Sequence, residues 1–348
     1  MSKVVKIGNV KIGGGNKIAI QSMANIKTEK ADEVVSQILD LEKAGCDIIR
    51  VAVKDFSDAD AIKKIKDKIH IPLVADVHFD YRLAIASIEN GVDKVRINPG
   101  NIGSEENVKA VADCLKRHSC VVRVGSNSGS VEKEYLEKYG KNEISLGESA
   151  LKRVAQLEKY GVEDIVISAK TSSVPTTIKT YRYIAERSSY PLHVGVTEAG
   201  TKRMGIIKSA VGIGSLLVDG IGDTIRVSLT ANPVEEIYAG KDLLRAIGLD
   251  KNYAEIISCP TCGRTEYDME KLAERVCEFT SNITKPVKIA VMGCVVNGPG
   301  EASDCDLGIA GGKGSCVIFK KGKVYKTIKS EEAEREFLKE IKEFVDQL

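Results

Sequence analysis

The fold class is decided by one stretch of sequence, Glu33-Val34-Val35-Ser36-Gln37-Ile38-Leu39-Asp40-Leu41, followed by Gly45 and then by Asp47-Ile48-Ile49-Arg50-Val51-Ala52-Val53. The first part has apolar residues about 3.6 positions apart, which predicts an amphipathic helix, and Gly45 suits its C-terminus. The second part is a β-branched run of strand length. A helix that leads directly into an apolar strand is the repeating unit of α/β folds with a parallel sheet.

The same alternation continues to about residue 250. The predicted strands lie over residues 17–23, 47–53, 72–78, 94–98, 121–125, 164–170, 192–197 and 224–229. Eight β/α units in a segment of this size are typical of a TIM (β/α)8 barrel, and a doubly wound open sheet is the competing arrangement. We therefore predict an α/β chain with a TIM barrel over residues 1–250 and a second domain over residues 251–348.

The second domain differs from the barrel segment in composition, because it contains cysteine-bearing turns and Gly-rich strands. Its predicted elements are helices over 269–279 and 331–345 and strands over 287–292, 307–309, 317–320 and 323–327, the last three forming an antiparallel set. The closing helix has a clear apolar stripe, so it should pack against these strands. This pattern predicts a small α+β domain.

Composition excludes several classes of protein. The 348 residues are 43% hydrophobic and 29% charged, with a net charge of +2, which is typical of a soluble globular protein without a nucleic-acid or membrane surface. The chain has no apolar run of about 18 residues, and its first residues lack the apolar core of a signal peptide. Nine cysteines without a secretion signal indicate reduced thiols and metal ligands rather than disulfides. We expect a cytoplasmic protein.

Polar side chains lie at or near the C-terminal ends of the predicted strands, where TIM barrels build their active sites. Because side chains alternate between the two faces of a strand, Arg96 shares a face with Asn98, and Asp76 shares one with His78. The predicted binding residues are Arg50, Asp76, His78, Arg96, Asn98, Arg123, Asn127, Lys170, His193, Arg226 and Ser228. Of these, His78 and His193 are equally well explained as hydrogen-bonded core histidines.

The cations in this set are unusual for a barrel interior. A single Arg in a strand is commonly an edge residue or the partner of a carboxylate. Several that converge on one barrel mouth are costly unless an anion neutralises them; here they are Arg50, Arg96, Arg123, Lys170 and Arg226. A phosphate-rich small molecule is the simplest such anion, since Arg binds phosphate in a bidentate manner.

Two segments near the C-terminus predict a metal centre. They are Cys259-Pro260-Thr261-Cys262-Gly263-Arg264 and Gly293-Cys294-Val295-Val296-Asn297-Gly298-Pro299-Gly300-Glu301. Three cysteines from two turns fit either zinc or an iron–sulfur cluster. Zinc commonly adds a fourth Cys or a His, but no His follows residue 193.

The fourth ligand is open between a thiol and a carboxylate. Cys305 and Cys316 are possible ligands, whereas Cys277 lies in a predicted helix and should be a buried thiol. Glu301 is the preferred choice because it follows a tight Gly-Pro-Gly turn. A carboxylate is also more readily displaced from iron than a thiolate, so it suits a site that must open to substrate.

These motifs resemble those of the (E)-4-hydroxy-3-methylbut-2-enyl diphosphate synthase family, also called IspG or GcpE. The likeness begins with Cys-Pro-x-Cys-Gly-Arg and Gly-Cys-x-Val-Asn-Gly-Pro-Gly-Glu, which are similar to the iron–sulfur module of that family. It extends through the barrel segments 51–53, 75–79, 95–101, 122–130 and 196–200. The resemblance covers essentially the whole chain, in the length of the bacterial two-domain form.

The resemblance implies a 4Fe–4S cluster held by Cys259, Cys262, Cys294 and Glu301. It implies reductive ring opening and dehydration of 2-C-methyl-D-erythritol 2,4-cyclodiphosphate in non-mevalonate isoprenoid biosynthesis. Two single electrons would come from flavodoxin or ferredoxin. The barrel cations would bind the diphosphate and Glu198 would be the catalytic acid/base. The family further implies a head-to-tail homodimer, in which the cluster domain of one subunit covers the barrel of the other.

Two other functions fit parts of the pattern. One is a phosphate- or pterin-binding TIM-barrel transferase with a structural zinc. The other is an electron carrier without enzymatic activity, but an electron carrier has no need of a cationic pocket. The colour of protein purified without oxygen distinguishes iron–sulfur from zinc.

Overall fold

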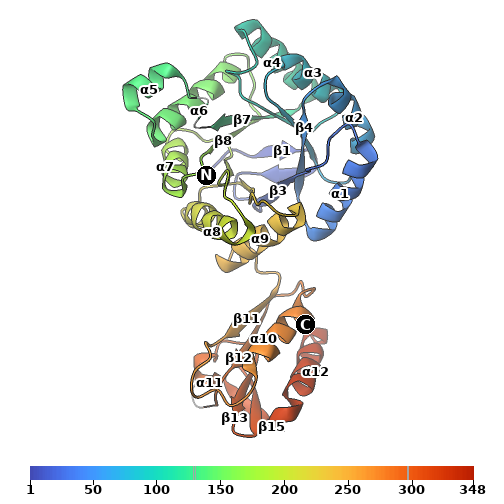
Figure 1. The fold of residues 1–348 in the computed structure, drawn as a ribbon, viewed down its shortest axis with the longest axis vertical. Helices are drawn as coiled ribbons and strands as arrows, with labels where there is room; N and C mark the ends of the chain where they lie inside the picture. Colours follow the sequence, from blue (N-terminus) through green and yellow to red (C-terminus); the bar gives the residue numbers. More distant parts are fainter. Residues whose placement is uncertain (128, 130, 296–297) are drawn as a thin grey trace. The chain divides into compact units, whose positions relative to one another are not determined.

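The computed structural model describes residues 1–127, 129, 131–295 and 298–348, except for the side chain of residue 127. The chain divides into two compact units, Met1–Ile247 and Gly248–Leu348 (Figure 1). None of the helices in these described ranges combines the length and the apolar character that crossing a membrane requires.

The first unit is a parallel barrel with its helices on the outside (Figure 1). In spatial order its strands are β8 (Ile165–Lys170), β7 (Val121–Asn127), β6 (Lys94–Ile97), β5 (Leu73–Val77), β4 (Ile48–Val53), β3 (Ala19–Met23), β10 (Thr224–Ile225) and β9 (His193–Val194). A parallel bridge between Ile167 and Leu192 joins the two ends of this order and closes the ring. The predicted TIM barrel is confirmed.

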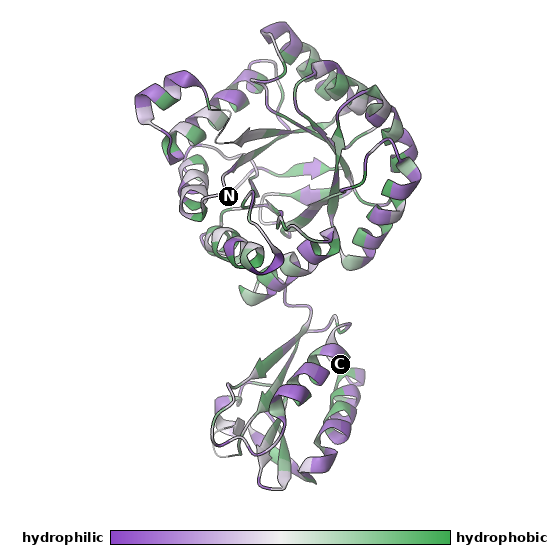
Figure 2. Cartoon of the chain, viewed as in Figure 1, coloured by the Kyte–Doolittle hydropathy of each residue, from purple (hydrophilic) through white to green (hydrophobic). Residues whose placement is uncertain are grey.

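The barrel helices follow the strands in the expected alternation. They are α1 (Ala31–Ala44), α2 (Phe56–Lys66), α3 (Tyr81–Glu89), α4 (Glu105–His118), α5 (Lys133–Tyr139), α6 (Glu143–Glu158), α7 (Val174–Ala185), α8 (Lys202–Val218) and α9 (Pro233–Ala246). Helix α1 ends at Gly45, whose φ of 95° lies in the left-handed region that glycine adopts without strain. The outer helices carry both hydrophilic and hydrophobic residues, as expected for elements with one buried face (Figure 2).

The barrel interior changes from apolar to cationic along its axis. A hairpin of β1 (Val5–Ile7) and β2 (Val10–Ile12) covers the N-terminal end, where it packs on inward-facing Ile48, Val74 and Val166. Further along the same strands the inward side chains are polar or charged: Arg50 and Asp76 follow directly, and Lys170 follows Ser168. The closed apolar end stabilises the barrel, which leaves the other end available for function.

The second unit is built on a mixed sheet in the order β11 (Ala254–Ser258), β12 (Val287–Met292), β13 (Leu307–Gly312), β14 (Ser315–Lys320) and β15 (Lys323–Lys329). The last three strands are antiparallel, as predicted, but β13 is also parallel to β12, and β11 was not predicted. Helices α10 (Met269–Thr280) and α12 (Ala333–Asp346) share one core with the sheet, and the short helix α11 (Gly298–Glu301) packs against β13.

The three remaining cysteines of this unit differ from one another. Cys277 is exposed on α10, so the expectation of a buried thiol is wrong. The buried positions of α10 are Met269, Leu272, Val276 and Thr280, and Cys277 lies beside this stripe, one position after Val276. Cys305 and Cys316 are both buried in apolar clusters of the unit.

Candidate active site

The centre of the barrel mouth is an ion-pair cluster around Asp76. Its Oδ2 lies 3.3 Å from Arg50 Nη1, and its Oδ1 lies 3.2 Å from Arg96 Nη1. Burial alone would raise the pKa of Asp76, but the two guanidinium groups outweigh burial and lower that pKa. One buried carboxylate thus holds two cations of the predicted set in place.

Arg123 completes this cluster, and some of its N–H donors have no hydrogen-bond partner among the described residues. Its side chain is 2% exposed, and its Nε and Nη1 atoms have no hydrogen-bond acceptor within the described part of the chain. Burial, together with the charges of Arg50 and Arg96, lowers the pKa of Arg123 well below its usual value. Arg50 Nε likewise lacks an acceptor among those residues. Unpaired buried donors of this kind are rare in proteins and indicate a place for an anion.

Lys170 joins the cations from β8, the strand next to that of Arg123. Burial and the nearby charges of Arg123, Arg226 and Arg50 lower the pKa of its ammonium group. Lys170 Nζ lies 3.0 Å from Nε2 of His193, which is completely buried. The five predicted cations therefore converge on one region.

Two glycines make room for these long side chains. A Cβ atom on Gly125, which lies on the inward face of β7, would collide with the guanidinium of Arg96. A Cβ atom on Gly195 would lie 2.8 Å from Lys170 Nζ. A larger residue at Gly125 would displace the Arg96 guanidinium, and one at Gly195 would also collide with the backbone carbonyl of Arg226, at 2.5 Å.

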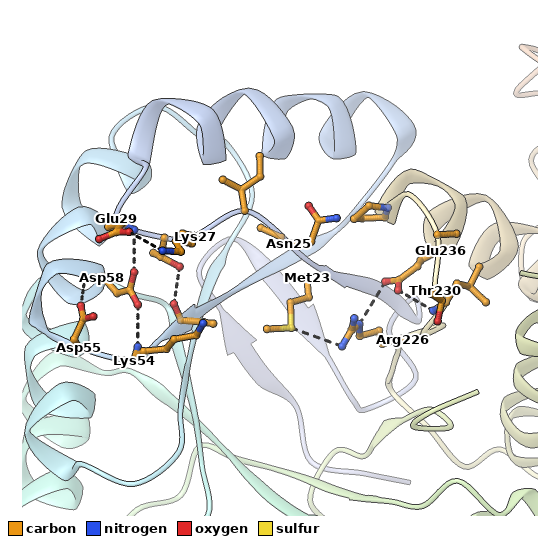
Figure 3. A pocket seen from close by; sticks show the side chains of 17 residues that line it. Met23, Asn25, Lys27, Glu29, Lys54, Asp55, Asp58, Arg226, Thr230 and Glu236 are labelled. Carbon is orange, nitrogen blue, oxygen red and sulfur yellow. Dashed lines mark hydrogen bonds and ion pairs between the residues drawn. The ribbon is translucent and has the colours of Figure 1, made fainter. Parts of the chain in front are cut away.

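Arg226 borders a pocket of about 630 Å³ between the strand ends of β3, β4 and β10 (Figure 3). Its Nε lies 3.4 Å from Oε2 of the buried residue Glu236, and its Nη1 contacts Met23 Sδ at 3.8 Å. Glu236 also accepts hydrogen bonds from Ser22 Oγ and from the backbone N–H of Leu229. These contacts fix the guanidinium group at the edge of the pocket.

The remaining predicted barrel residues are placed less uniformly. His78 is exposed, with its Nδ1 3.0 Å from Arg96 Nη1. Asn98 is buried and uses its Oδ1 to accept the N–H of Gly100, which leaves its amide N–H groups for a ligand. Ser228 is half-buried beyond β10. The backbone of Asn127 ends β7, but its side chain lies outside the described residues.

Glu198 is exposed in the loop between β9 and α8. Its φ of 52° is in the left-handed region, which costs a non-glycine residue about 1 kcal/mol. The loop thus holds this carboxylate in an unfavourable backbone conformation, as is common at functional positions.

The predicted cysteine ligands lie on turns of the second unit, whereas Glu301 ends the short helix α11. Cys259 follows β11 and Cys294 follows β12, and these neighbouring parallel strands end side by side. The backbone N–H of Gly293 donates to Cys259 Sγ at 3.1 Å. Arg264 is bonded to Cys262 and feels the charges of Cys294 and Glu301, all of which raise its pKa.

These contacts bring the four predicted ligands into one neighbourhood. Among the described residues, no three His, Cys, Asp or Glu side chains are gathered as they would be around a single metal ion. A four-iron cluster instead spaces its ligands around its corners, so three thiols from two turns and a carboxylate at the end of α11 suit it in chemistry. Cys305 and Cys316 face apolar clusters of the unit.

The sequence and both units match one protein family. The model of the GcpE TIM-barrel domain matches residues 2–241, and that of the GcpE C-terminal domain matches residues 255–343. The chain belongs to the GcpE family. This membership confirms the resemblance that the cysteine motifs and the barrel segments indicated.

Similar GcpE proteins extend over the full chain. One from Caldanaerobacter subterraneus subsp. tengcongensis is 59% identical, covering 99% of this chain and 98% of the relative. One from Clostridium perfringens is 55% identical, covering 97% of each. Both are named 4-hydroxy-3-methylbut-2-en-1-yl diphosphate synthase (flavodoxin).

Among solved structures, the GcpE barrel is similar in fold to dihydropteroate synthase. The enzyme from Stenotrophomonas maltophilia matches with a TM-score of 0.53 at 13% identity, covering 70% of this chain and 97% of that structure. The enzyme from Yersinia pestis matches with a TM-score of 0.52 at 11% identity, covering 71% and 100%. At this level of identity the likeness supports the barrel fold and nothing about substrate.

Three residues of the GcpE site escaped the sequence analysis. Lys94 is fully buried two positions before Arg96 on β6, and the same alternation argument could have found it. Glu236 and Tyr181 lie on helices α9 and α7, and no local signal distinguishes them from core residues. Their roles come from contacts with distant strands, which a single sequence does not reveal.

Proposed function

We propose that this chain is a 4-hydroxy-3-methylbut-2-en-1-yl diphosphate synthase of the non-mevalonate isoprenoid pathway. It takes 2-C-methyl-D-erythritol 2,4-cyclodiphosphate, opens the ring, removes one oxygen as water and adds two electrons one at a time. The observation that carries the substrate class is Arg123, a buried guanidinium with unpaired donors among the cations of the barrel mouth. Family membership selects this reaction from those of other phosphate-binding barrels.

The barrel residues bind and orient the diphosphate. Arg50 and Arg123 have donors ready for phosphate oxygens, while Asp76 fixes the direction of Arg50 and Arg96. Lys170 adds charge from β8 and Arg226 from the end of β10, and Asn98, Asn127 and Ser228 would complete the hydrogen bonds. Because these groups are preorganised, little side-chain entropy is lost when the anion binds.

Proton transfer is assigned to Glu198. It is an exposed residue in the loop after β9, at the end of the barrel where TIM-barrel loops build active sites. We infer that it delivers the proton with which the departing hydroxyl leaves as water. His78 and Asp76 support the site through Arg96, to which both are bonded.

Cys259, Cys262, Cys294 and Glu301 would hold the 4Fe–4S cluster. When bound, the cluster supplies the two single electrons and a Lewis-acidic iron for the C–O bond that breaks. The Gly293 N–H bond to Cys259 Sγ and the adjacent Arg264 are suited to stabilise negative charge on the cluster. The relatives' names support flavodoxin, rather than ferredoxin, as the electron donor.

A homodimer is part of this proposal, since the cluster ligands and the diphosphate-binding cations lie on separate units of the chain. Helix α8 supports a subunit interface. Its exposed residues Met204, Ile207, Val211 and Val218 recur at helix spacing and form an apolar stripe. Ile207→Asp should convert the dimer to a monomer in light scattering, and a dimer that survives this change would place the interface elsewhere.

Shared sites can be tested by mixing inactive subunits. Cys294→Ala removes a cluster ligand, and Glu198→Ala removes the acid/base group. If the dimer is head-to-tail, a mixed dimer contains one intact site and regains part of the activity. No recovery in verified mixed dimers would mean that each chain uses its own cluster.

The decisive experiment for the function is anaerobic. The protein is reconstituted with iron and sulfide and given the cyclic diphosphate and a one-electron reductant. Formation of the linear allylic diphosphate supports the proposal. A protein that holds the iron cluster but forms no product from this substrate would contradict the substrate, and one that takes up only zinc would favour the barrel transferase.

A further inference from the structure

The barrel has an interrupted seam between β8 and β9. Ile167 N donates to Pro191 O at 2.9 Å, and in a parallel ladder the donor two residues later bonds the acceptor two residues later. Ala169 N should therefore donate to His193 O. Instead, Ala169 N donates to the hydroxyl of Tyr181 at 3.1 Å, and that hydroxyl donates to His193 O at 2.7 Å.

Tyr181 thus inserts a hydroxyl group into the ladder of the barrel. Its side chain is completely buried and comes from α7, outside the ring of strands. The inserted hydroxyl satisfies both backbone groups, so the strands can separate here at no cost in hydrogen bonds. The next residue on β8 is Lys170, and its ammonium group lies so close to Gly195 that a Cβ atom there would be 2.8 Å from Nζ.

The imidazole of His193 connects the seam to Lys170. Its Nε2 lies 3.0 Å from Lys170 Nζ, and its Nδ1 lies 2.7 Å from Thr224 Oγ1 on β10. His193 and Thr224 are both completely buried, and so they lie behind Lys170 rather than in the mouth. Burial, Lys170 and Arg123 together lower the pKa of His193, which keeps the ring neutral.

We propose that Tyr181, His193 and Thr224 are positioning residues that direct the Lys170 ammonium toward the diphosphate, an inference that rests on the proposed function. An ammonium has three donors and no acceptor. One donor goes to His193 Nε2, which leaves two for the anion. The ring must then carry its proton on Nδ1 and donate it to Thr224 Oγ1. The seam residues thus act through Lys170, without touching the substrate.

Kinetics of His193 variants test the role. His193→Leu removes the acceptor, and we expect KM for the cyclic diphosphate to rise roughly tenfold with a smaller change in kcat, because the lost interaction is ground-state binding. His193→Gln keeps an acceptor and should restore most of the affinity. The matched control is His118→Gln at the exposed end of α4, which should leave KM unchanged. Leu and Gln variants with the wild-type KM would overturn the proposal.

NMR of the imidazole groups reports which nitrogen of His193 carries the proton, a property that a purely structural role would not determine. The chain has four histidines, so His193→Gln assigns the His193 signals by difference. In wild-type protein with the cyclic diphosphate bound, we expect the neutral ring with its proton on Nδ1. A proton on Nε2, or an imidazolium, would overturn the proposal even if the Leu variant fails to fold.

The two proposals fail in different ways. If wild-type protein neither binds nor converts the cyclic diphosphate, the proposed function fails. If it does both while the His193 variants match wild type and the tautomer is the wrong one, only the positioning network fails.

Discussion

The two units hold their functional residues in opposite ways. In the barrel, Asp76, Arg96 and Arg123 lie on strands, are buried, and are kept in place by ion pairs and by space left at glycines. In the second unit, Cys262 is exposed, and Cys259 and Cys294 are half-buried on turns. The proposed anion site is therefore formed before its ligand arrives, whereas the proposed cluster ligands would depend on the cluster to fix their geometry.

This difference has an energetic consequence. A preformed cation site leaves charges unpaired in the folded protein, so it lowers stability until the anion binds. Thiols on exposed turns carry no such cost, because water solvates them when the cluster is absent. We expect that losing a cluster ligand lowers activity and leaves the stability of the barrel unchanged. Losing an unpaired barrel cation should lower activity and raise stability.

The largest effect should come from losing a cluster ligand. Cys294→Ala should abolish activity and most of the bound iron, because three ligands cannot hold the cluster against solvent. The barrel should keep its stability, since Cys294 belongs to the other unit. Iron content, visible absorption and thermal unfolding measure these three quantities.

The matched control is Cys277→Ala, which removes an exposed cysteine of the same unit that lies on α10. It should leave iron content and activity unchanged. Hydrogen exchange should also slow in the turns after β11 and β12 when the cluster is loaded, with little change in the barrel strands. Equal protection before and after loading would contradict the idea that the cluster organises these turns.

Arg123→Met should have the next largest effect, with opposite signs for activity and stability. Losing two charged hydrogen bonds to phosphate should cost about 3 kcal/mol, or roughly a hundredfold in kcat/KM. The free energy of unfolding without substrate should rise, because an unpaired buried charge is replaced by an apolar side chain. Steady-state kinetics and urea unfolding give both values.

The control for this substitution is Arg82→Met, where the guanidinium is exposed and pairs with Asp80. It should change stability by less than about 0.5 kcal/mol and leave kinetics unaltered. A marked loss of stability in Arg123→Met would show that the buried guanidinium stabilises the apo barrel, and would remove the contrast between the two units.

Asp76→Asn should destabilise the barrel by about 3 kcal/mol, because it leaves Arg50 and Arg96 buried without their carboxylate. The pKa of Asp76 is lowered in the folded state, so its stabilisation is present above the unfolded value near 3.8 and is lost as pH falls through the lower folded value. Wild-type stability should therefore decrease below about pH 4.

The variant tests this assignment through its pH profile. Urea unfolding at neutral pH and at about pH 3 should show a smaller acid-induced loss for Asp76→Asn than for wild type. The control is Asp113→Asn, because Asp113 forms an exposed pair with Lys116 and should contribute little. An unchanged acid dependence in Asp76→Asn would assign the acid sensitivity to other carboxylates.

The barrel could be predicted because its information is local. Each helix and strand has its own periodicity, and Arg96 and Arg123 reveal their inward direction by alternation along their strands. The same reasoning missed β11, a strand whose residues are half-buried or exposed. A strand at the edge of a mixed sheet lacks a strong period, and its partner, β12, is far along the sequence.

The candidate site shows the same difference between local signals in the sequence and tertiary contacts. Residues on the strands, such as Arg50 and Lys170, were predicted because strand ends meet at one barrel mouth. Residues that reach the site from helices, such as Glu236 and Tyr181, are recognised only by their hydrogen bonds to strand residues far away in the sequence. The cluster ligands stay a prediction, which rests on cysteine spacing as a chemical signal and on the family resemblance.

Tyr181→Phe should change stability and activity least among these variants. It tests whether the preformed barrel site depends on the hydroxyl inserted between β8 and β9. Removing the hydroxyl leaves Ala169 N–H and His193 C=O without their shared partner, which should cost about 1–3 kcal/mol if the strands stay apart. Tyr160→Phe is the control, since its hydroxyl bonds the exposed Glu105 and should contribute less than about 0.5 kcal/mol.

If the strands instead close and pair directly, the Ala169 amide will stay protected from exchange, stability will be nearly unchanged, and KM will still rise because the closed seam displaces Lys170. A variant with unchanged stability, exchange and KM would show that the inserted hydroxyl is incidental and that the preformed site does not depend on an open seam.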